Sequence, residues 1–119
     1  MSNPNIVNTS AIYGQVAGQA VGTSLTAIVT NAASSNKIYK INSLIVANID
    51  GGADAQIDAV VDIAGTDYYI ASTVTVPKDA SIVLITKDSS VYLTENSKIE
   101  LKANVTGDLH AVCSYEEIS

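Results

Sequence analysis

Apolar and polar residues alternate most regularly near the end of the chain, between residues 98 and 105. One set of positions is aliphatic: Ile99, Leu101, Ala103 and Val105. The intervening set is polar: Lys98, Glu100, Lys102 and Asn104. Because successive side chains of a strand point to opposite sides of its sheet, the pattern predicts an amphipathic strand with its aliphatic side in a core.

Residues 56–63 alternate in the same way, with one exception. The positions predicted to face inward are Ile57, Ala59, Val61 and Ile63, and those predicted to face outward are Gln56, Asp58 and Asp62. Val60 interrupts the polar side. We interpret this segment as a second half-buried strand.

Two aliphatic runs, residues 44–47 and 82–85, do not alternate. The first lies in the longest predicted strand, residues 37–49, where the pattern changes at Asn42-Ser43. Such a change predicts a β-bulge or a strand that enters a region buried on both faces. Both runs are also candidate surface between subunits. Further strands are predicted at residues 25–31, 68–76, 81–86, 91–93 and 109–115.

Segments rich in Gly, Asn, Asp and Ser separate these strands. We interpret residues 32–36 and Gly107-Asp108 as hairpin turns, and Asp50-Gly51-Gly52 and Gly65-Thr66-Asp67 as tight turns. The four-residue spacing of Gly14, Gly18 and Gly22 predicts a Gly-kinked edge strand or a loop.

Eight or nine short strands without a helical segment are typical of two packed antiparallel sheets. The predicted fold class is therefore all-β, a single antiparallel β-sandwich or jelly-roll-like domain over residues 11–119. Residues 1–10 contain Pro4 and are polar apart from Met1, Ile6 and Val7, which predicts an extended N-terminal arm.

The composition agrees with one packed β domain. The 119 residues include 14 Ile, 13 Val and 10 Thr, whose branched side chains favour strands. Hydrophobic residues make up 47% and charged residues 15%, so the chain has to bury a core. A chain of this length supports one domain. No segment predicts a signal peptide or a membrane span.

The charge balance argues against a nucleic-acid partner. Twelve acidic residues oppose six Lys, with no Arg, and the net charge is −6. Such a chain has few groups with which to neutralise phosphates and lacks the guanidinium that reads guanine.

His110 and Cys113 are the single His and the single Cys of the chain. On one strand these positions point to opposite faces, so they cannot form a catalytic couple. We interpret Cys113 as a small buried side chain and His110 as a surface or interface residue. No phosphate loop, nucleophile elbow or zinc-binding helix motif is present in the sequence, so we predict no enzyme activity and no cofactor.

Four acidic residues recur at four-residue spacing: Asp50, Asp54, Asp58 and Asp62. That spacing gathers carboxylates only on a helix, whereas this segment predicts a turn followed by a strand. A calcium site in a loop at Asp50 and Asp54 stays open as an alternative to a solvated acidic hairpin, and we predict no metal site.

The chain resembles small virion structural proteins of tailed bacteriophages, notably those of marine cyanobacteria. The likeness extends over nearly the whole chain. The segments that carry it are residues 3–8 (NPNIVN), 31–44 (NAASSNKIYKINSL), 46–51 (VANIDG), 76–80 (VPKDA), 87–93 (KDSSVYL) and 107–119 (GDLHAVCSYEEIS).

This resemblance implies a capsid decoration or cement protein that binds the exterior of the virion head and is made in the host cytoplasm. The implied partners are the major capsid protein and further copies of the chain, in a homo-oligomer that we expect to be a trimer. We expect the N-terminal arm to supply one contact, through Asn3, Pro4, Asn5, Ile6 and Val7. Exposed arms of this kind can add a strand to a neighbouring sheet edge.

Two alternatives stay open. The first is a tail, fibre or baseplate adaptor. The second is a jelly-roll carbohydrate-binding module, whose possible sugar platforms are Tyr13, Tyr39, Tyr68, Tyr69, Tyr92 and Tyr115.

Overall fold

The computed structural model describes residues 11–119. This part of the chain contains nine strands and one short 3-10 helix. The strands are β1 (Ile12–Ala20), β2 (Thr26–Asn31), β3 (Ile38–Asn48), β4 (Ala55–Ile63), β5 (Thr66–Val76), β6 (Ser81–Ile85), β7 (Val91–Leu93), β8 (Ser97–Ala103) and β9 (Leu109–Ile118). The helix η1 (Lys87–Ser89) lies between β6 and β7. The predicted all-β class is confirmed.

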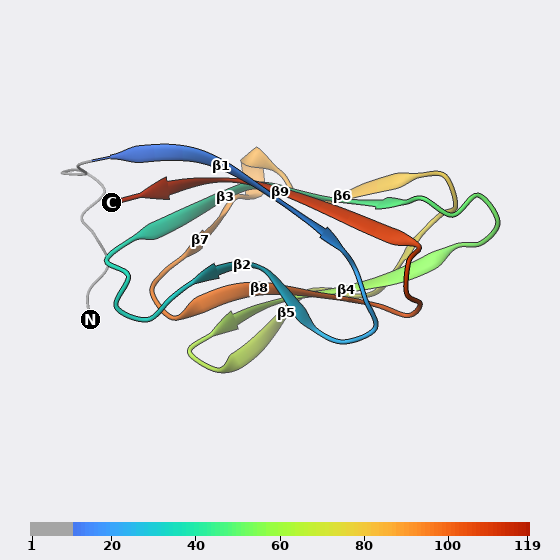
Figure 1. Ribbon diagram of the computed structural model, residues 1–119, viewed down its shortest axis with the longest axis horizontal. Coiled ribbons are helices and arrows are strands. Elements are labelled where there is room, and N and C mark those ends of the chain that lie inside the picture. Colours follow the sequence, from blue (N-terminus) through green and yellow to red (C-terminus); the bar gives the residue numbers. More distant parts are fainter. Residues whose placement is uncertain (1–10) are drawn as a thin grey trace.

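The strands form two antiparallel sheets that pack face to face (Figure 1). Sheet A has the order β1-β9-β3-β6, with β7 also paired to β3, and sheet B has the order β2-β8-β4-β5. Strands β6 and β7 pair with successive parts of β3 on one edge, so they act as two halves of one strand. Eight strands in two sheets of four, in this order, are a jelly roll.

Most connections cross from one sheet to the other. Residues 32–37 join β2 of sheet B to β3 of sheet A, and residues 104–108 join β8 of sheet B to β9 of sheet A. The two hairpin predictions at these loops are therefore wrong, because turn-forming residues reverse the chain without specifying which sheet it enters. Asp50-Gly51-Gly52 likewise lies in a crossover, between β3 and β4.

A true hairpin joins β4 to β5. Ile63 pairs with Thr66, and the two residues between them, Ala64 and Gly65, have φ of 53° and 93°. Positive φ at both central positions is what a type I′ turn requires, and glycine adopts it without strain. The turn therefore lies one residue earlier than the predicted Gly65-Thr66-Asp67.

The bulge predicted in the long strand is confirmed. The register of β3 against β9 shifts between Ile41 and Ser43. Beyond the shift Leu44 and Val46 are fully buried, whereas Ile45 is 38% exposed. Burial on both faces is thus wrong for the isolated chain, because the outer side of sheet A is open.

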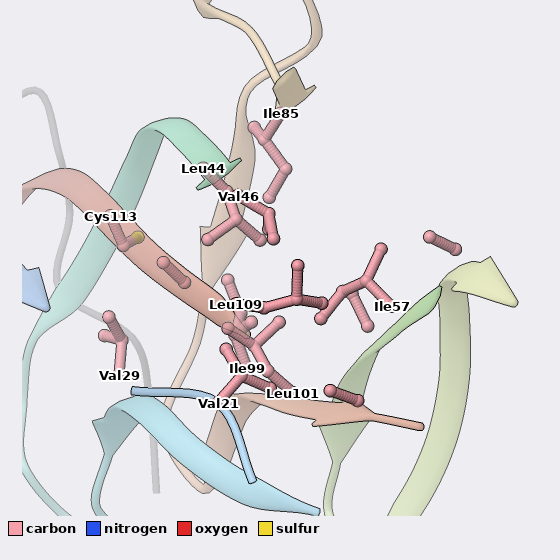
Figure 2. Close-up of a cluster of buried hydrophobic side chains, with 14 of the residues drawn as sticks. Val21, Val29, Leu44, Val46, Ile57, Ile85, Ile99, Leu101, Leu109 and Cys113 are labelled. Carbon is pink, nitrogen blue, oxygen red and sulfur yellow. The ribbon is translucent and has the colours of Figure 1, made fainter. Parts of the chain in front are cut away.

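The core lies between the sheets and is built from aliphatic side chains of both (Figure 2). Its largest fully buried members are Ile41, Leu44, Ile57, Ile85, Leu93, Ile99, Leu101, Leu109, Val21, Val46 and Val76. The inward positions predicted for β8 are confirmed at Ile99, Leu101 and Ala103. Val105 follows the end of β8 and is partly exposed.

The prediction for β4 is wrong at one position, and a second position is buried on the side that was predicted to face outward. Ile63, predicted to face inward, lies at the hairpin and is 48% exposed. Val60 faces away from the core and is nevertheless fully buried. Its register partners are Glu100 and Tyr69, and long side chains of this kind can cover an aliphatic neighbour with their apolar parts.

Two buried asparagines hold the sheets together through crossover loops. Asn31, at the end of β2, donates from Nδ2 to the carbonyl oxygens of Lys37 and Leu93, both at 2.9 Å, and accepts from the Ser35 hydroxyl. Asn48, at the end of β3, donates to the carbonyl oxygens of Ala53 and Val76, both at 3.0 Å. Each amide therefore joins a strand of one sheet to a strand of the other.

No helix within residues 11–119 is long and apolar enough to cross a membrane.

Candidate assembly surface

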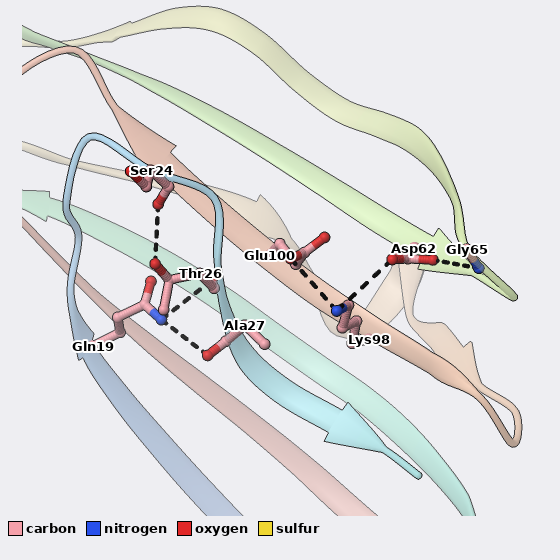
Figure 3. Close-up of polar contacts among 8 residues, drawn as sticks. All are labelled: Gln19, Ser24, Thr26, Ala27, Asp62, Gly65, Lys98 and Glu100. Atoms are coloured by element: carbon pink, nitrogen blue, oxygen red, sulfur yellow. Dashed lines mark hydrogen bonds and ion pairs between the residues drawn. The ribbon is translucent and has the colours of Figure 1, made fainter. Parts of the chain in front are cut away.

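The charged side chains of β4 and β8 form a network of ion pairs on the outer face of sheet B. Lys98 Nζ lies 3.9 Å from Asp62 Oδ2 and 3.7 Å from Glu100 Oε2 (Figure 3). Lys102 Nζ lies 3.6 Å from Asp58 Oδ2. Exposed pairs of this kind contribute little stability. The outer face of sheet B therefore presents paired charges to solvent.

The outer face of sheet A is different, because exposed aliphatic side chains lie on β6, β3, β9 and β1. Val83 of β6 pairs with Ile45 of β3, Ile45 pairs with Val112 of β9, and Val112 pairs with Gly18 of β1. Register partners point to the same side of a sheet, so these residues form one row. Val16 of β1 lies in the next row.

We name Val16, Ile45, Val83 and Val112 the aliphatic face. Their side chains are between 38% and 69% exposed, and Val16 is the most exposed of them. The register places small or uncharged residues beside them: Gly18, Ala20, Ser43, Ala47, Ser81 and Ser114, with the exposed His110 at one end. A contiguous apolar patch flanked by small polar residues is typical of a protein contact surface.

Beyond Ser114 the outer side of sheet A carries the register partners Glu116 and Lys40, whereas the start of the chain carries no charge. The first charged side chain of the sequence is Lys37. Both β1, an edge of sheet A, and β2, an edge of sheet B, precede it. Counting charged residues by position along the sequence reveals this distribution.

Gln19 connects these two edge strands. Its Nε2 donates to the carbonyl oxygen of Ala27 at 3.0 Å and to that of Thr26 at 3.3 Å (Figure 3). Gln19 Oε1 is buried without a hydrogen-bond partner. The bonds fix β1 over β2 and occupy two backbone acceptors of β2.

The predicted separation of His110 and Cys113 is confirmed. His110 is exposed on the outer face of sheet A, whereas Cys113 is fully buried between the sheets (Figure 2). Burial raises the pKa of the Cys113 thiol from 9.0 to about 11. The side chain is therefore a protonated thiol at neutral pH.

We expect Cys113 to react with iodoacetamide at pH 8 about 100-fold more slowly in the folded protein than in guanidinium, because the raised pKa lowers the thiolate fraction by that factor and burial adds to it. Since the folded pKa exceeds the unfolded value, stability should also fall as the pH rises from about 9 towards about 11. Mass spectrometry of the alkylated chain measures the rate. Equal rates in the two states would contradict the burial of the thiol.

The acidic residues weighed as a calcium site take part in loop hydrogen bonds. Asp50 Oδ1 accepts from the Gly52 amide at 2.8 Å, and Asp54 Oδ1 accepts from the Lys78 amide at 3.0 Å. The pKa of the Asp108 carboxyl is raised, first by desolvation and then by the charge of the nearby Asp50. The carboxylates of Asp50 and Asp54 thus stabilise the loops around them through hydrogen bonds to backbone amides.

A second acidic group lies on sheet B. The carboxylates of Asp62, Asp67 and Glu100 lie within 4.8 Å of one another. Two of the three are already ion-paired to Lys98. The group is therefore part of the network of ion pairs on sheet B.

The tyrosines are dispersed over several elements. Tyr39 and Tyr115 stack on each other, with ring centroids 5.3 Å apart, and both are partly buried against the core. Tyr68 and Tyr69 are adjacent in β5 and pair with Val61 and Val60, so they point to opposite sides of sheet B. Tyr68 and Tyr69 therefore do not form one platform for a sugar.

The residues predicted to form the arm contact, Asn3, Pro4, Asn5, Ile6 and Val7, lie outside the described residues. Within residues 11–119, the uninterrupted aliphatic runs that the sequence analysis assigned to a subunit interface supply Ile45 and Val83 of the aliphatic face. Val16 and Val112 were not predicted, because neither lies in such a run.

No protein-family model and no curated protein matches the chain. Among solved structures, the chain is similar to one from Bacillus endospore appendages, described as disulfide-linked pili, with 10% sequence identity and a TM-score of 0.44. The similarity covers 98% of this chain and 95% of that chain.

Proposed function

We propose that this protein is a structural component of a tailed bacteriophage virion, a decoration or cement protein that binds the outer surface of the head and stabilises it. The proposal is supported by the resemblance of the sequence to small virion proteins and by the two unlike faces of the sandwich. The partners are the major capsid protein and further copies of the chain. The trimer implied by the resemblance stays a prediction.

The observation that carries the proposal is the contrast between the outer faces of the two sheets. Sheet B presents paired charges, whereas sheet A presents the aliphatic face. A protein that lies on a shell needs one face for the shell and one for water. Burying the aliphatic face on a capsid would remove its apolar surface from water, which is favourable.

The charge of the protein fits the exterior of a head. The net charge is −6 and the chain has no Arg. Packaged DNA would repel an acidic surface inside the head, whereas a protein on the outside of the shell does not contact the DNA. Each contact can be weak, because many copies that associate with one another gain avidity.

The experiment compares one added charge on each face. In Val112→Asp the carboxylate lies in the middle of the aliphatic face, and in the matched control Thr75→Asp it lies on the exposed edge strand of sheet B. We expect Val112→Asp to lower the number of copies per head about tenfold or more, because an unpaired charge would be buried in the contact. Thr75→Asp should leave the number unchanged.

Copies per head are measured by quantitative gel analysis of purified particles, and circular dichroism verifies that both variants are folded. Full occupancy with Val112→Asp would exclude the aliphatic face as the contact. An equal loss with both variants would also exclude it, since the effect would then not depend on the face.

A further inference from the structure

Within the part of the chain that the structure describes, the outer edge of β1 is the most regular open edge of the sandwich. All nine residues of β1 pair with β9 in one register without a bulge. The strand contains no charge and no proline. Natural edge strands are protected from other strands by such devices, and their absence marks an edge that accepts another strand.

The other edges carry these devices. β5 has register shifts, and its β-branched Thr73 has φ of 54°. β6 has five residues and is followed by η1, which interrupts the edge before β7. β2 has six residues and a bulge, and Gln19 occupies its Thr26 and Ala27 carbonyl oxygens.

The hydrogen bonds at the ends of β1 show which of its backbone groups have no partner within residues 11–119. Ala11 and Ser119 exchange two backbone hydrogen bonds, and Val21 donates to Leu109. Because bonding alternates along an antiparallel pair, the odd-numbered residues between them also bond β9. The N–H and C=O groups of five residues therefore point to the open edge: Ile12, Gly14, Val16, Gly18 and Ala20.

We propose that β1 pairs with β1 of a second copy of this chain, antiparallel and about a two-fold axis at Val16. This register places residue 12 opposite residue 20, 14 opposite 18, and Val16 opposite Val16 of the second copy. Every free donor and acceptor then faces a free partner. Shifting the axis to Gln15 or Ala17 keeps the bonding parity but shortens the overlap.

The chemistry of the strand favours a second copy as its partner. Two chains with a net charge of −6 repel each other, but β1 and the adjacent β2 contribute no charge. Gly14 and Gly18 face each other across the axis. A Cβ added at Gly14 would meet no atom within 4 Å, so there is open space beside this residue. The pairing also joins the sheets A of the two copies, so their aliphatic faces become continuous.

The first test places a proline in β1 at a position whose N–H group points to the open edge. The substitution removes that donor and keeps the hydrogen bonds between β1 and β9. Proline is tolerated on an edge strand where its nitrogen faces solvent, and Val16 is such a position. In a symmetric pair Val16→Pro removes both central hydrogen bonds, so we expect the dimer dissociation constant to rise about 100-fold or more. Val16→Thr keeps the donor and should dimerise like the unchanged chain.

Sedimentation equilibrium over a range of concentrations measures the association, and thermal unfolding verifies that the variants are folded. Val112→Lys, on the aliphatic face but away from the edge, should still dimerise. Loss of the dimer in Val112→Lys together with its retention in Val16→Pro would overturn the edge pairing. A monomer of the unchanged chain would also overturn it, and so would a trimer, which is the state that the resemblance to virion proteins implies.

A crosslink tests the register. Val16→Cys places two thiols on paired residues about 5.5 Å apart between Cα atoms, within reach of a short bismaleimide. The control Ile12→Cys is similarly exposed, but its two copies lie eight residues apart along the strands, about 27 Å. We expect crosslinked dimer with Val16→Cys only. Crosslinking at both positions or only at residue 12 would overturn the register.

Deletion of residues 2–10 separates this contact from an arm contact. The β1 pairing predicts an unchanged dimer after the deletion. A monomeric deletion variant would instead make the N-terminal arm of the neighbouring copy the occupant of the edge. The pairing needs no virion partner, so its failure leaves the proposed binding to the head to be tested by occupancy.

Discussion

Leu44→Ala is expected to lower the free energy of unfolding by about 2 to 5 kcal/mol. Leu44 is fully buried in β3, where it pairs with Cys113 of β9 and Ile85 of β6. Its side chain points into the layer between the sheets (Figure 2). Removing it leaves a cavity that strands held on both sides cannot close.

The next residue supplies the matched control. Ile45 lies on the same strand but points outward and is partly exposed. Ile45→Ala should cost less than about 1 kcal/mol in the isolated protein, since it opens no cavity. Urea denaturation followed by circular dichroism gives both values. Equal losses for the two variants would contradict the assignment of the inner and outer faces of sheet A.

Asn48→Ala is expected to cost about 2 to 4 kcal/mol, because it removes three hydrogen bonds and leaves the buried Val76 carbonyl oxygen without its donor. The Nδ2 donates to Ala53 and Val76, and Oδ1 accepts from the Asp50 amide at 2.9 Å. The loop between β3 and β4 and the end of β5 lose their connection together.

Asn104→Ala is the control for this prediction. Asn104 is exposed, and its Oδ1 accepts one bond, from the Gln56 amide at 2.9 Å. Water can replace that bond, so the expected cost is below about 1 kcal/mol. The same urea experiment compares the two variants. A cost of Asn48→Ala no greater than that of Asn104→Ala would show that the buried amide does not connect the sheets.

The strands were predictable because alternation is a local property. In β8 the predicted inward positions Ile99, Leu101 and Ala103 are buried, whereas Val105 lies beyond the strand and is partly exposed. The bulge in β3 was predicted from Asn42-Ser43. The connections were less predictable. The Gly107-Asp108 turn reverses the chain as expected, but the choice between pairing with β8 and crossing to sheet A depends on contacts distant in sequence.

Two further features depended on tertiary neighbours. Val60 is fully buried on the outer side of sheet B, where its register partners are Glu100 and Tyr69 of adjacent strands, which its own segment does not specify. Asn48 resembles any polar residue at the end of a strand, and its buried role follows from the Val76 carbonyl oxygen, which approaches from the other sheet.

The candidate surface was predicted in part. Ile45 and Val83 belong to aliphatic runs that were interpreted as subunit surface. Val112 and Val16 complete the face only through the β9 and β1 registers, which no local pattern determines. The contrast between a charged and an aliphatic outer face therefore emerges from strand order.

Electron microscopy of virions that contain and lack this protein tests the proposed function most directly. We predict density on the exterior of the head that is present only when the protein is present, with sheet A towards the shell and the ion-paired face of sheet B towards solvent. Density confined to the tail or baseplate, or particles of identical structure in both preparations, would contradict the account.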